Sequence, residues 1–310
     1  MCKMKVRNSL AQALKKSLYE SLDADMLERM AQDVIPDYDL RQRTGFPPNI
    51  PMQAQTAASR IVDDVVDAEL FLHFIERLAR LDREGFMGRG YRIAGLREIF
   101  KAIGAEGYLW DAETGLFMED PRIRRTHNWG RLVQGEELRL SFLRIDIVKN
   151  SRIVKVHGEN AARSAYEDLR GILARSVERR SGRIWNFEGD GALAAFLYGH
   201  STTSSVLAGM SLVHELFLYN RLYNRIGEPI RVRAAVHTGP VRYVPEIGEI
   251  LKQETCREVV EAESKWTPTD ALSITPAVAG TLDRVILDRF KPGVEPGSRA
   301  LVYTIALGAV

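Results

Sequence analysis

Two aspartates stand where their carboxylates could do chemistry. Asp146 lies near the end of an apolar run, residues 144–148 (RIDIV), where a carboxylate is costly to bury unless something pairs with it. Asp190 lies between Gly189 and Gly191, which permit a tight turn and leave the carboxylate unobstructed. Each has an ordinary interpretation when taken alone: Asp146 as a strand-end cap or an ion-pair partner, and Asp190 as a turn residue.

Together the two aspartates indicate more than either does separately. Carboxylates at close range repel each other, and a divalent cation is a common reason for a protein to keep them together. Oxygen ligands suit Mg²⁺ or Mn²⁺, and two such ions are suited to attack at a phosphorus centre. The pair predicts a two-metal site if the fold brings Asp146 and Asp190 face to face.

The pattern of apolar residues supplies elements that would position the two aspartates. The order of expected elements after residue 136 is βαββαβ, the ferredoxin-like plan. In this plan the first and third strands are neighbours, so the end of the first strand lies beside the turn at 189–191. The expected strands are 138–148, 183–188, 192–198, 230–237 and 301–307, the expected helices are 160–180, 206–226 and 254–265, and a further hairpin is expected at 243–250.

The first part of the chain has a different pattern. Leu10, Leu14, Leu18 and Leu22 recur at four-residue spacing with charged residues between them, which is typical of an amphipathic helix. We expect a helical N-terminal region at 1–105, a connector at 106–135 and an α+β domain at 136–310.

Composition excludes several classes of protein. The 310 residues carry a net charge of +2, which argues against a dedicated nucleic-acid binder. Two cysteines cannot form a disulfide framework or a multi-cysteine zinc site. Apolar runs fall short of the roughly 20 residues that a membrane span needs. We therefore expect a cytoplasmic protein with no membrane span.

Three segments of the chain form a pattern, residues 144–148 (RIDIV), 185–196 (WNFEGDGALAAF) and 232–241 (VRAAVHTGPV). Together they resemble class III nucleotidyl cyclases. Those enzymes have a first-strand DIV aspartate, a hairpin GD aspartate and a later IHTGPV strand. The resemblance covers roughly residues 138 to 285, and the order and spacing of the segments make it more specific than any one of them.

The resemblance implies a class III cyclase domain that acts as a head-to-tail homodimer, with its active sites at the subunit interface. Asp146, Asp190 and the main-chain carbonyl of Ile147 would hold two divalent ions, Mn²⁺ or Mg²⁺. The residues expected beside the triphosphate are Lys149, Asn150 and Ser151. The implied reaction is attack of the ribose 3′ oxygen on the α-phosphorus, with release of pyrophosphate.

Departures from the family concern the base and the transition state. Purine cyclases carry a lysine where this chain has Asn186, so a neutral amide that donates and accepts replaces a point charge. The helix at 257–265 has no base-reading aspartate, and Val260 and Ser264 fall near the positions of the transition-state Asn and Arg. The basic residues that remain as possible substitutes are Lys265 and Arg257.

Retention of both metal aspartates favours an active enzyme that reads another base. The chain resembles the pyrimidine cyclases of the bacterial anti-phage Pycsar system, which make cUMP or cCMP for a separate effector. This resemblance favours UTP over CTP. Two alternatives stay open: an adenylate or guanylate cyclase with unusual base contacts, and a catalytically silent cyclase-homology module that binds a nucleotide.

Three further residues have weaker indications. His237 has no partners at metal-ligand spacing and is expected to be structural. Arg231 and Arg233 alternate with Val232 on one strand, so both are candidates for contacts with phosphates or with an interface.

Overall fold

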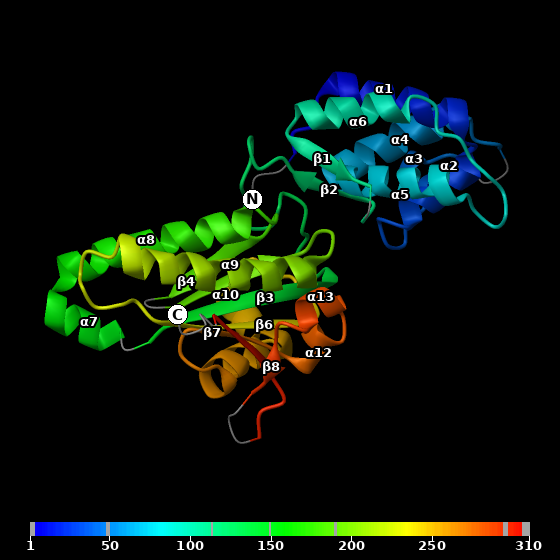
Figure 1. Cartoon of the computed structure of the whole chain (residues 1–310). Coiled ribbons are helices and arrows are strands. Elements are labelled where there is room, and N and C mark those ends of the chain that lie inside the picture. The colour runs from blue at the N-terminus through cyan, green and yellow to red at the C-terminus, as the bar shows by residue number, and fades with distance from the viewer. Residues whose placement is uncertain are drawn as a thin grey trace. The chain divides into compact units, whose positions relative to one another are not determined.

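A computed structural model describes residues 4–47, 50–112, 114–148, 150–188, 191–293 and 297–305. The chain divides into two compact units, Met1–Arg131 and Leu132–Val310. Figure 1 colours both units along the chain from blue to red.

Unit 1 is mainly helical, as the sequence predicts. The leucine series at 10, 14, 18 and 22 is buried along one side of α1, because four-residue spacing keeps the side chains on one face. The expected helical region contains α1 (Asn8–Ser21), α2 (Ala24–Gln32), α3 (Leu40–Thr44), α4 (Ala54–Asp67), α5 (Phe71–Glu84) and α6 (Leu96–Ala105).

A small antiparallel sheet follows α6 in unit 1. It consists of β1 (Tyr108–Asp111) and β2 (Leu116–Glu119), and Phe117 of β2 donates its amide to Glu76 of α5 at 2.8 Å. Much of the segment 106–135, expected as a connector, is thus built into unit 1, and the division between the units lies inside it at 131/132.

Unit 2 is an α+β structure whose element order confirms the predicted βαββαβ plan. Its sheet has the strand order β4-β5-β3-β6-β7-β9-β8, and among the described residues only the β6–β7 pair is parallel. The strands are β3 (Glu137–Ile147), β4 (Arg183–Glu188), β5 (Gly191–Phe196), β6 (Val232–Arg242), β7 (Ala271–Ile274), β8 (Lys291–Pro292) and β9 (Leu301–Thr304).

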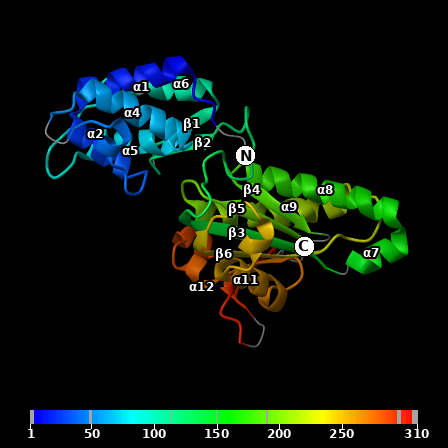
Figure 2. The same cartoon turned by 180° about the vertical axis from the view of Figure 1, so that it is seen from behind.

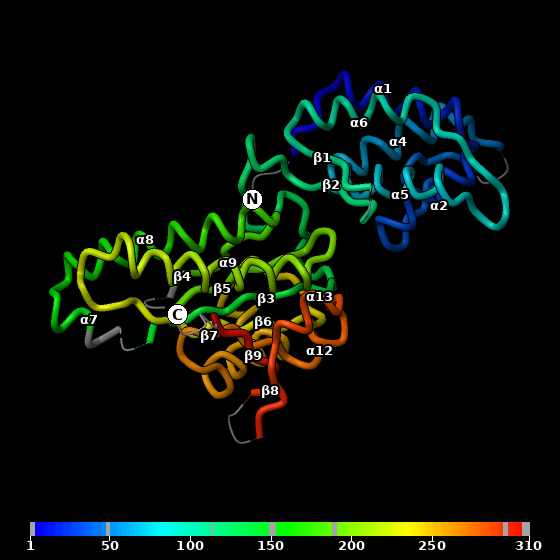
Figure 3. Tube along the Cα trace, in the orientation of Figure 1, coloured from blue at the N-terminus to red at the C-terminus, as the bar shows by residue number. Residues whose placement is uncertain are grey.

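Helices cover the sheet of unit 2. The long helices α8 and α9 lie side by side along one face, and their apolar sides form the main core with the strands (Figures 1 and 2). Figure 3 traces the crossing from β3 through α7 and α8 to β4. The helices are α7 (Asn150–His157), α8 (Glu159–Glu178), α9 (Ser201–Leu222), α10 (Ile247–Leu251), α11 (Glu254–Glu261), the π-helical turn η1 (Ala262–Trp266), α12 (Pro276–Ala279) and α13 (Arg284–Leu287).

The structure corrects several expected elements. The hairpin expected at 243–250 is wrong, because Ile247–Leu251 form the short helix α10 instead. The helix expected at 206–226 begins earlier and ends earlier, at Ser201–Leu222, and the helix expected at 254–265 changes to a π-helical turn after Glu261. The strand expected at 192–198 is β5, which ends at Phe196.

Candidate active site

Strand β3 presents Asp146 on the face of the sheet opposite the main core. Successive strand residues point to opposite faces, and Ile145 and Ile147 enter the core with α8 and α9. The Asp146 side chain is 20% exposed, so its charge is partly withdrawn from water. It accepts a hydrogen bond at 2.7 Å from Nη2 of Arg233, which supplies the pairing that such a carboxylate requires.

The strand register places three positions in a row across the sheet. Asp146 lies opposite Gly191 of β5 on one side and opposite Arg233 of β6 on the other. The predicted adjacency of the first and third strands is therefore confirmed by the β3–β5 pairing. Asp190 lies outside the described residues, but the residue that follows it is the direct partner of Asp146.

The side chain of Arg144 approaches the backbone so closely at Gly191 that a larger residue would not fit there without displacing it. A Cβ atom at this position would lie 2.6 Å from Nη2 of Arg144 and 3.2 Å from the carbonyl oxygen of Ile145. Arg144, which stands two residues before Asp146 on the same strand, therefore packs directly over the glycine. The glycine thus allows the arginine to cover the start of β5.

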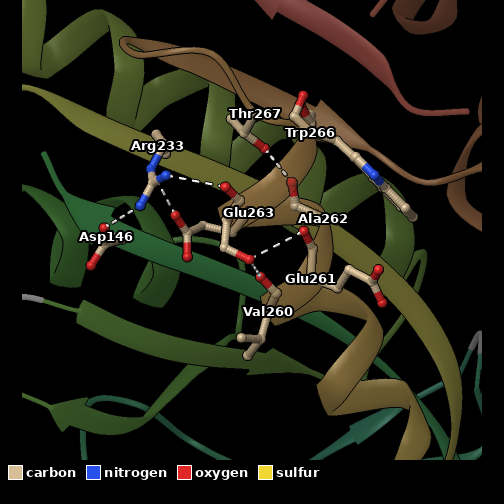
Figure 4. A network of polar contacts seen from close by, with 10 residues as sticks. Asp146, Arg233, Val260, Glu261, Ala262, Glu263, Trp266 and Thr267 are labelled. Carbon is tan, nitrogen blue, oxygen red and sulfur yellow. Dashed lines mark hydrogen bonds and ion pairs between the residues drawn. The ribbon is translucent and has the colours of Figure 1, made fainter. Parts of the chain in front are cut away.

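Arg233 is held by two hydrogen bonds and by an ion pair with Glu263, and these contacts come from two parts of the chain (Figure 4). Besides Asp146, its Nε atom lies 3.0 Å from Oε1 of Glu263, and its Nη1 atom donates to the carbonyl oxygen of Ser264 at 3.2 Å. Glu263 and Ser264 both belong to η1, the turn that follows α11. Sequence analysis did not find Glu263, because the residues that face the sheet depend on the π-helical register of this turn.

The other residues predicted to contact the nucleotide lie at different distances along the chain and the sheet from Asp146. Asn186 pairs with Leu193, which pairs with Arg144, so Asn186 lies two strands away from β3. Asn150 and Ser151 begin α7, just after β3, whereas Lys149 lies outside the described residues. A segment at a helix start can offer backbone N–H groups to an anion.

Three of the four α11–η1 residues expected near the transition state, Val260, Ser264 and Lys265, make contacts within their own helix. Lys265 pairs with Glu261 at 2.8 Å, and both side chains are well exposed. The Ser264 hydroxyl donates to the carbonyl oxygen of Val260 at 2.8 Å. Arg257 is exposed on α11. None of these four contacts Asp146 in a described interaction.

His237 and Arg231 have structural partners. The imidazole of His237 lies 2.8 Å from the hydroxyl of Thr275 and 3.1 Å from the carboxylate of Glu258, and burial lowers its pKa. These contacts are consistent with the structural role expected for His237. Arg231 lies 3.6 Å from the carboxylate of Asp270, so it does not share the partners of Arg233.

The end of β3 carries oxygen atoms of the kind that a hard divalent cation binds. Asp146 supplies a partly exposed carboxylate, and the main-chain carbonyl of Ile147 belongs to the next residue. Among the described residues no group of three or more His, Cys, Asp or Glu side chains is arranged to hold a metal. A site with two ions would therefore need Asp190 as well.

Comparisons with known proteins give structural similarities only. No family model and no curated protein matches the chain. It is similar in structure to the guanylate cyclase domain of RhGC from Catenaria anguillulae in complex with GTP, at 12% identity and a TM-score of 0.43, over 54% of this chain and 96% of that one. It is also similar to the adenylyl cyclase CyaB from P. aeruginosa, at 14% identity and a TM-score of 0.46, over 57% and 98% of the two chains.

A third similar structure is the guanylyl cyclase Cya2, at 17% identity and a TM-score of 0.45, over 55% of this chain and 92% of that one. Identities and scores at this level do not assign an activity to the chain. A separate structural finding is that no helix within the described ranges is long and apolar enough to cross a membrane.

Proposed function

We propose that the protein is a divalent-metal-dependent nucleotidyl cyclase. The observation that carries this proposal is the register of Asp146 with Gly191. Consecutive Cα atoms are about 3.8 Å apart, so the chain position of Asp190 is one short step from the residue opposite Asp146. Two carboxylates from β3 and from the β4–β5 turn would then share the divalent ions that the sequence predicts.

The residues of the chain have separate parts in this reaction. Asp146, Asp190 and the Ile147 carbonyl would hold two Mg²⁺ or Mn²⁺ ions, which when bound lower the pKa of the ribose 3′ hydroxyl and neutralise the triphosphate. Arg233 carries a guanidinium fork suited to phosphate oxygens, and it already stands beside Asp146. The 3′ oxygen, once its proton has passed to water, would attack the α-phosphorus. The bond from that phosphorus to the bridging oxygen would break, and pyrophosphate would leave with the electrons of that bond.

We infer a pyrimidine substrate, with UTP favoured over CTP. The support is the neutral amide of Asn186 at the position where purine cyclases carry lysine, together with the resemblance of the chain to Pycsar cyclases. An amide can donate to one base atom and accept from another, so Asn186 could contact a pyrimidine without the point charge of a lysine. The product would be cyclic UMP, acting on a separate effector in anti-phage defence, and the enzyme would be a homodimer with its sites at the interface.

Product analysis tests this function directly. The purified protein is incubated separately with labelled ATP, GTP, CTP and UTP in Mn²⁺ or Mg²⁺, and products are separated against cyclic standards. We expect cyclic UMP from the wild type and none from Asp146→Ala or Asp190→Ala. Cyclic AMP or GMP would keep the mechanism and reject the pyrimidine substrate. Absence of any product from folded dimer would instead favour the nucleotide-binding module.

A further inference from the structure

The guanidinium of Arg233 contacts two carboxylates, but more of its nitrogen atoms face η1 than face Asp146. Its Nη2 edge meets Asp146, while Nε and Nη1 both meet η1, at Glu263 and at the Ser264 carbonyl. Figure 4 shows the arginine between the two carboxylates. Single π-helical turns are rare and frequently occur at functional sites, and this one presents a carboxylate as an ion-pair partner and a carbonyl oxygen as an acceptor to the same side chain.

Burial decides which carboxylate keeps the arginine when they compete. The Glu263 side chain is 4% exposed, whereas that of Asp146 is 20% exposed. Removing the cation from a buried carboxylate leaves a charge that little water can solvate, and this costs more than exposing a carboxylate at a strand end. Arg233 should therefore remain on Glu263 when another cation takes Asp146.

We propose that Glu263 is a positioning residue that keeps Arg233 anchored on η1, so that Asp146 is available to a divalent cation. The inference rests on the proposed function, because it takes Asp146 as a metal ligand. Without the charge of Glu263, Arg233 pairs with Asp146 alone and competes with the metal ion for it. Glu263 acts through the arginine and needs no contact with the metal or the nucleotide.

Binding of Mn²⁺, followed by electron paramagnetic resonance without nucleotide, tests the inference. Glu263→Gln keeps the shape of the side chain and removes its charge, and we expect it to weaken Mn²⁺ binding roughly fivefold, the effect of about 1 kcal/mol. The matched control is Glu261→Gln, which removes an exposed charge from the same helical segment, two residues away. The control should bind Mn²⁺ as the wild type does.

A double substitution separates positioning from structural damage. If Glu263 acts only through the arginine, Glu263→Gln should have no effect on Mn²⁺ binding in an Arg233→Met background, although both single changes alter it. An equal loss in both backgrounds would overturn the inference, because it would show an effect of Glu263 that does not pass through Arg233. Thermal unfolding of each variant identifies a loss of folded protein.

The outcomes distinguish this inference from the proposed function. Asp146→Asn reports whether the measured Mn²⁺ is bound at Asp146. If the wild type binds no more tightly than Asp146→Asn, the proposed function fails and the inference falls with it. If the wild type does bind more tightly but Glu263→Gln equals the wild type, only the inference is overturned.

Discussion

Asp146, near the end of β3, has two opposing requirements: it needs a cationic partner, and it must also be open to a metal ion. Asp146 lies partly buried on the sheet and needs a cationic partner, which Arg233 supplies. The same pairing blocks the carboxylate from other cations. Glu263 resolves this conflict by offering the arginine a second, more deeply buried anion.

Replacing the single residue Gly191 by alanine should affect both stability and activity. In Gly191→Ala the new Cβ would displace Arg144, whose guanidinium can rotate, but it would also lie 3.2 Å from the rigid carbonyl of Ile145. We expect a stability loss of about 1–2 kcal/mol. Because the β4–β5 turn would shift beside Asp146, cyclase activity should fall roughly tenfold or more.

Urea unfolding and product formation, measured on the same preparations, check this expectation. The control is Gly248→Ala in α10, where an added Cβ meets nothing within 4 Å. Full activity in Gly191→Ala would show that the close approach of Arg144 to the strand is not required for the site.

At the scale of elements, the junction between α8 and β4 fixes the hairpin that carries Asn186. Gly182 stands at this junction, and a Cβ there would lie 2.5 Å from the Phe196 ring and 2.7 Å from Val177. Both neighbours belong to the packed core and cannot move aside. Gly182→Ala should therefore destabilise the protein by about 1–3 kcal/mol.

Gly171 in α8 gives the opposite expectation. A Cβ added there approaches only the guanidinium of Arg175, at 3.4 Å, so alanine gains helix propensity without a clash. Gly171→Ala should stabilise the protein by about 0.5–1 kcal/mol. Urea midpoints of the two variants, measured side by side, check the contrast. Equal effects would show that packing at the α8–β4 junction does not limit stability.

The elements also show what the sequence can predict. Strand alternation around Asp146 and the glycines around Asp190 were sufficient for β3, for the pairing of β3 with β5 and for the βαββαβ order. The partners of Arg233 could not be predicted, because they depend on a π-helical turn whose register leaves no periodic signal. The hairpin expected at 243–250 was wrong because Ile247, Ile250 and Leu251 are spaced three and four residues apart, which fits the short helix α10.

At the scale of the whole molecule, the proposed homodimer makes activity depend on concentration. If each site takes residues from two chains, specific activity should fall on dilution as dimers dissociate. Sedimentation at the same concentrations measures the dimer fraction, and the two curves should coincide. Undiminished activity in a sample that sediments as monomer would contradict a site shared between subunits.

Acid should destabilise both units, because each contains a histidine whose pKa is lowered by burial. Burial, with Arg131 and Arg77 nearby, lowers the pKa of His73 in unit 1 to about 4, and burial also lowers that of His237 in unit 2. Above pH 7 the imidazole is neutral in both states, so stability is complete. As the pH falls below about 6.5, the unfolded chain binds the proton first and stability is lost.

For His73 the expected loss between pH 7.5 and pH 5 is about 2 kcal/mol of unfolding free energy. The measurement is hydrogen exchange of α5 peptides at increasing urea in the full chain, for the wild type and for His73→Leu, which has no proton to gain. Other titrating groups contribute equally to both proteins, so the wild type should lose about 2 kcal/mol more than the variant over this range. Identical pH dependence would mean that His73 can be protonated in the folded unit, for which its surroundings would have to admit water.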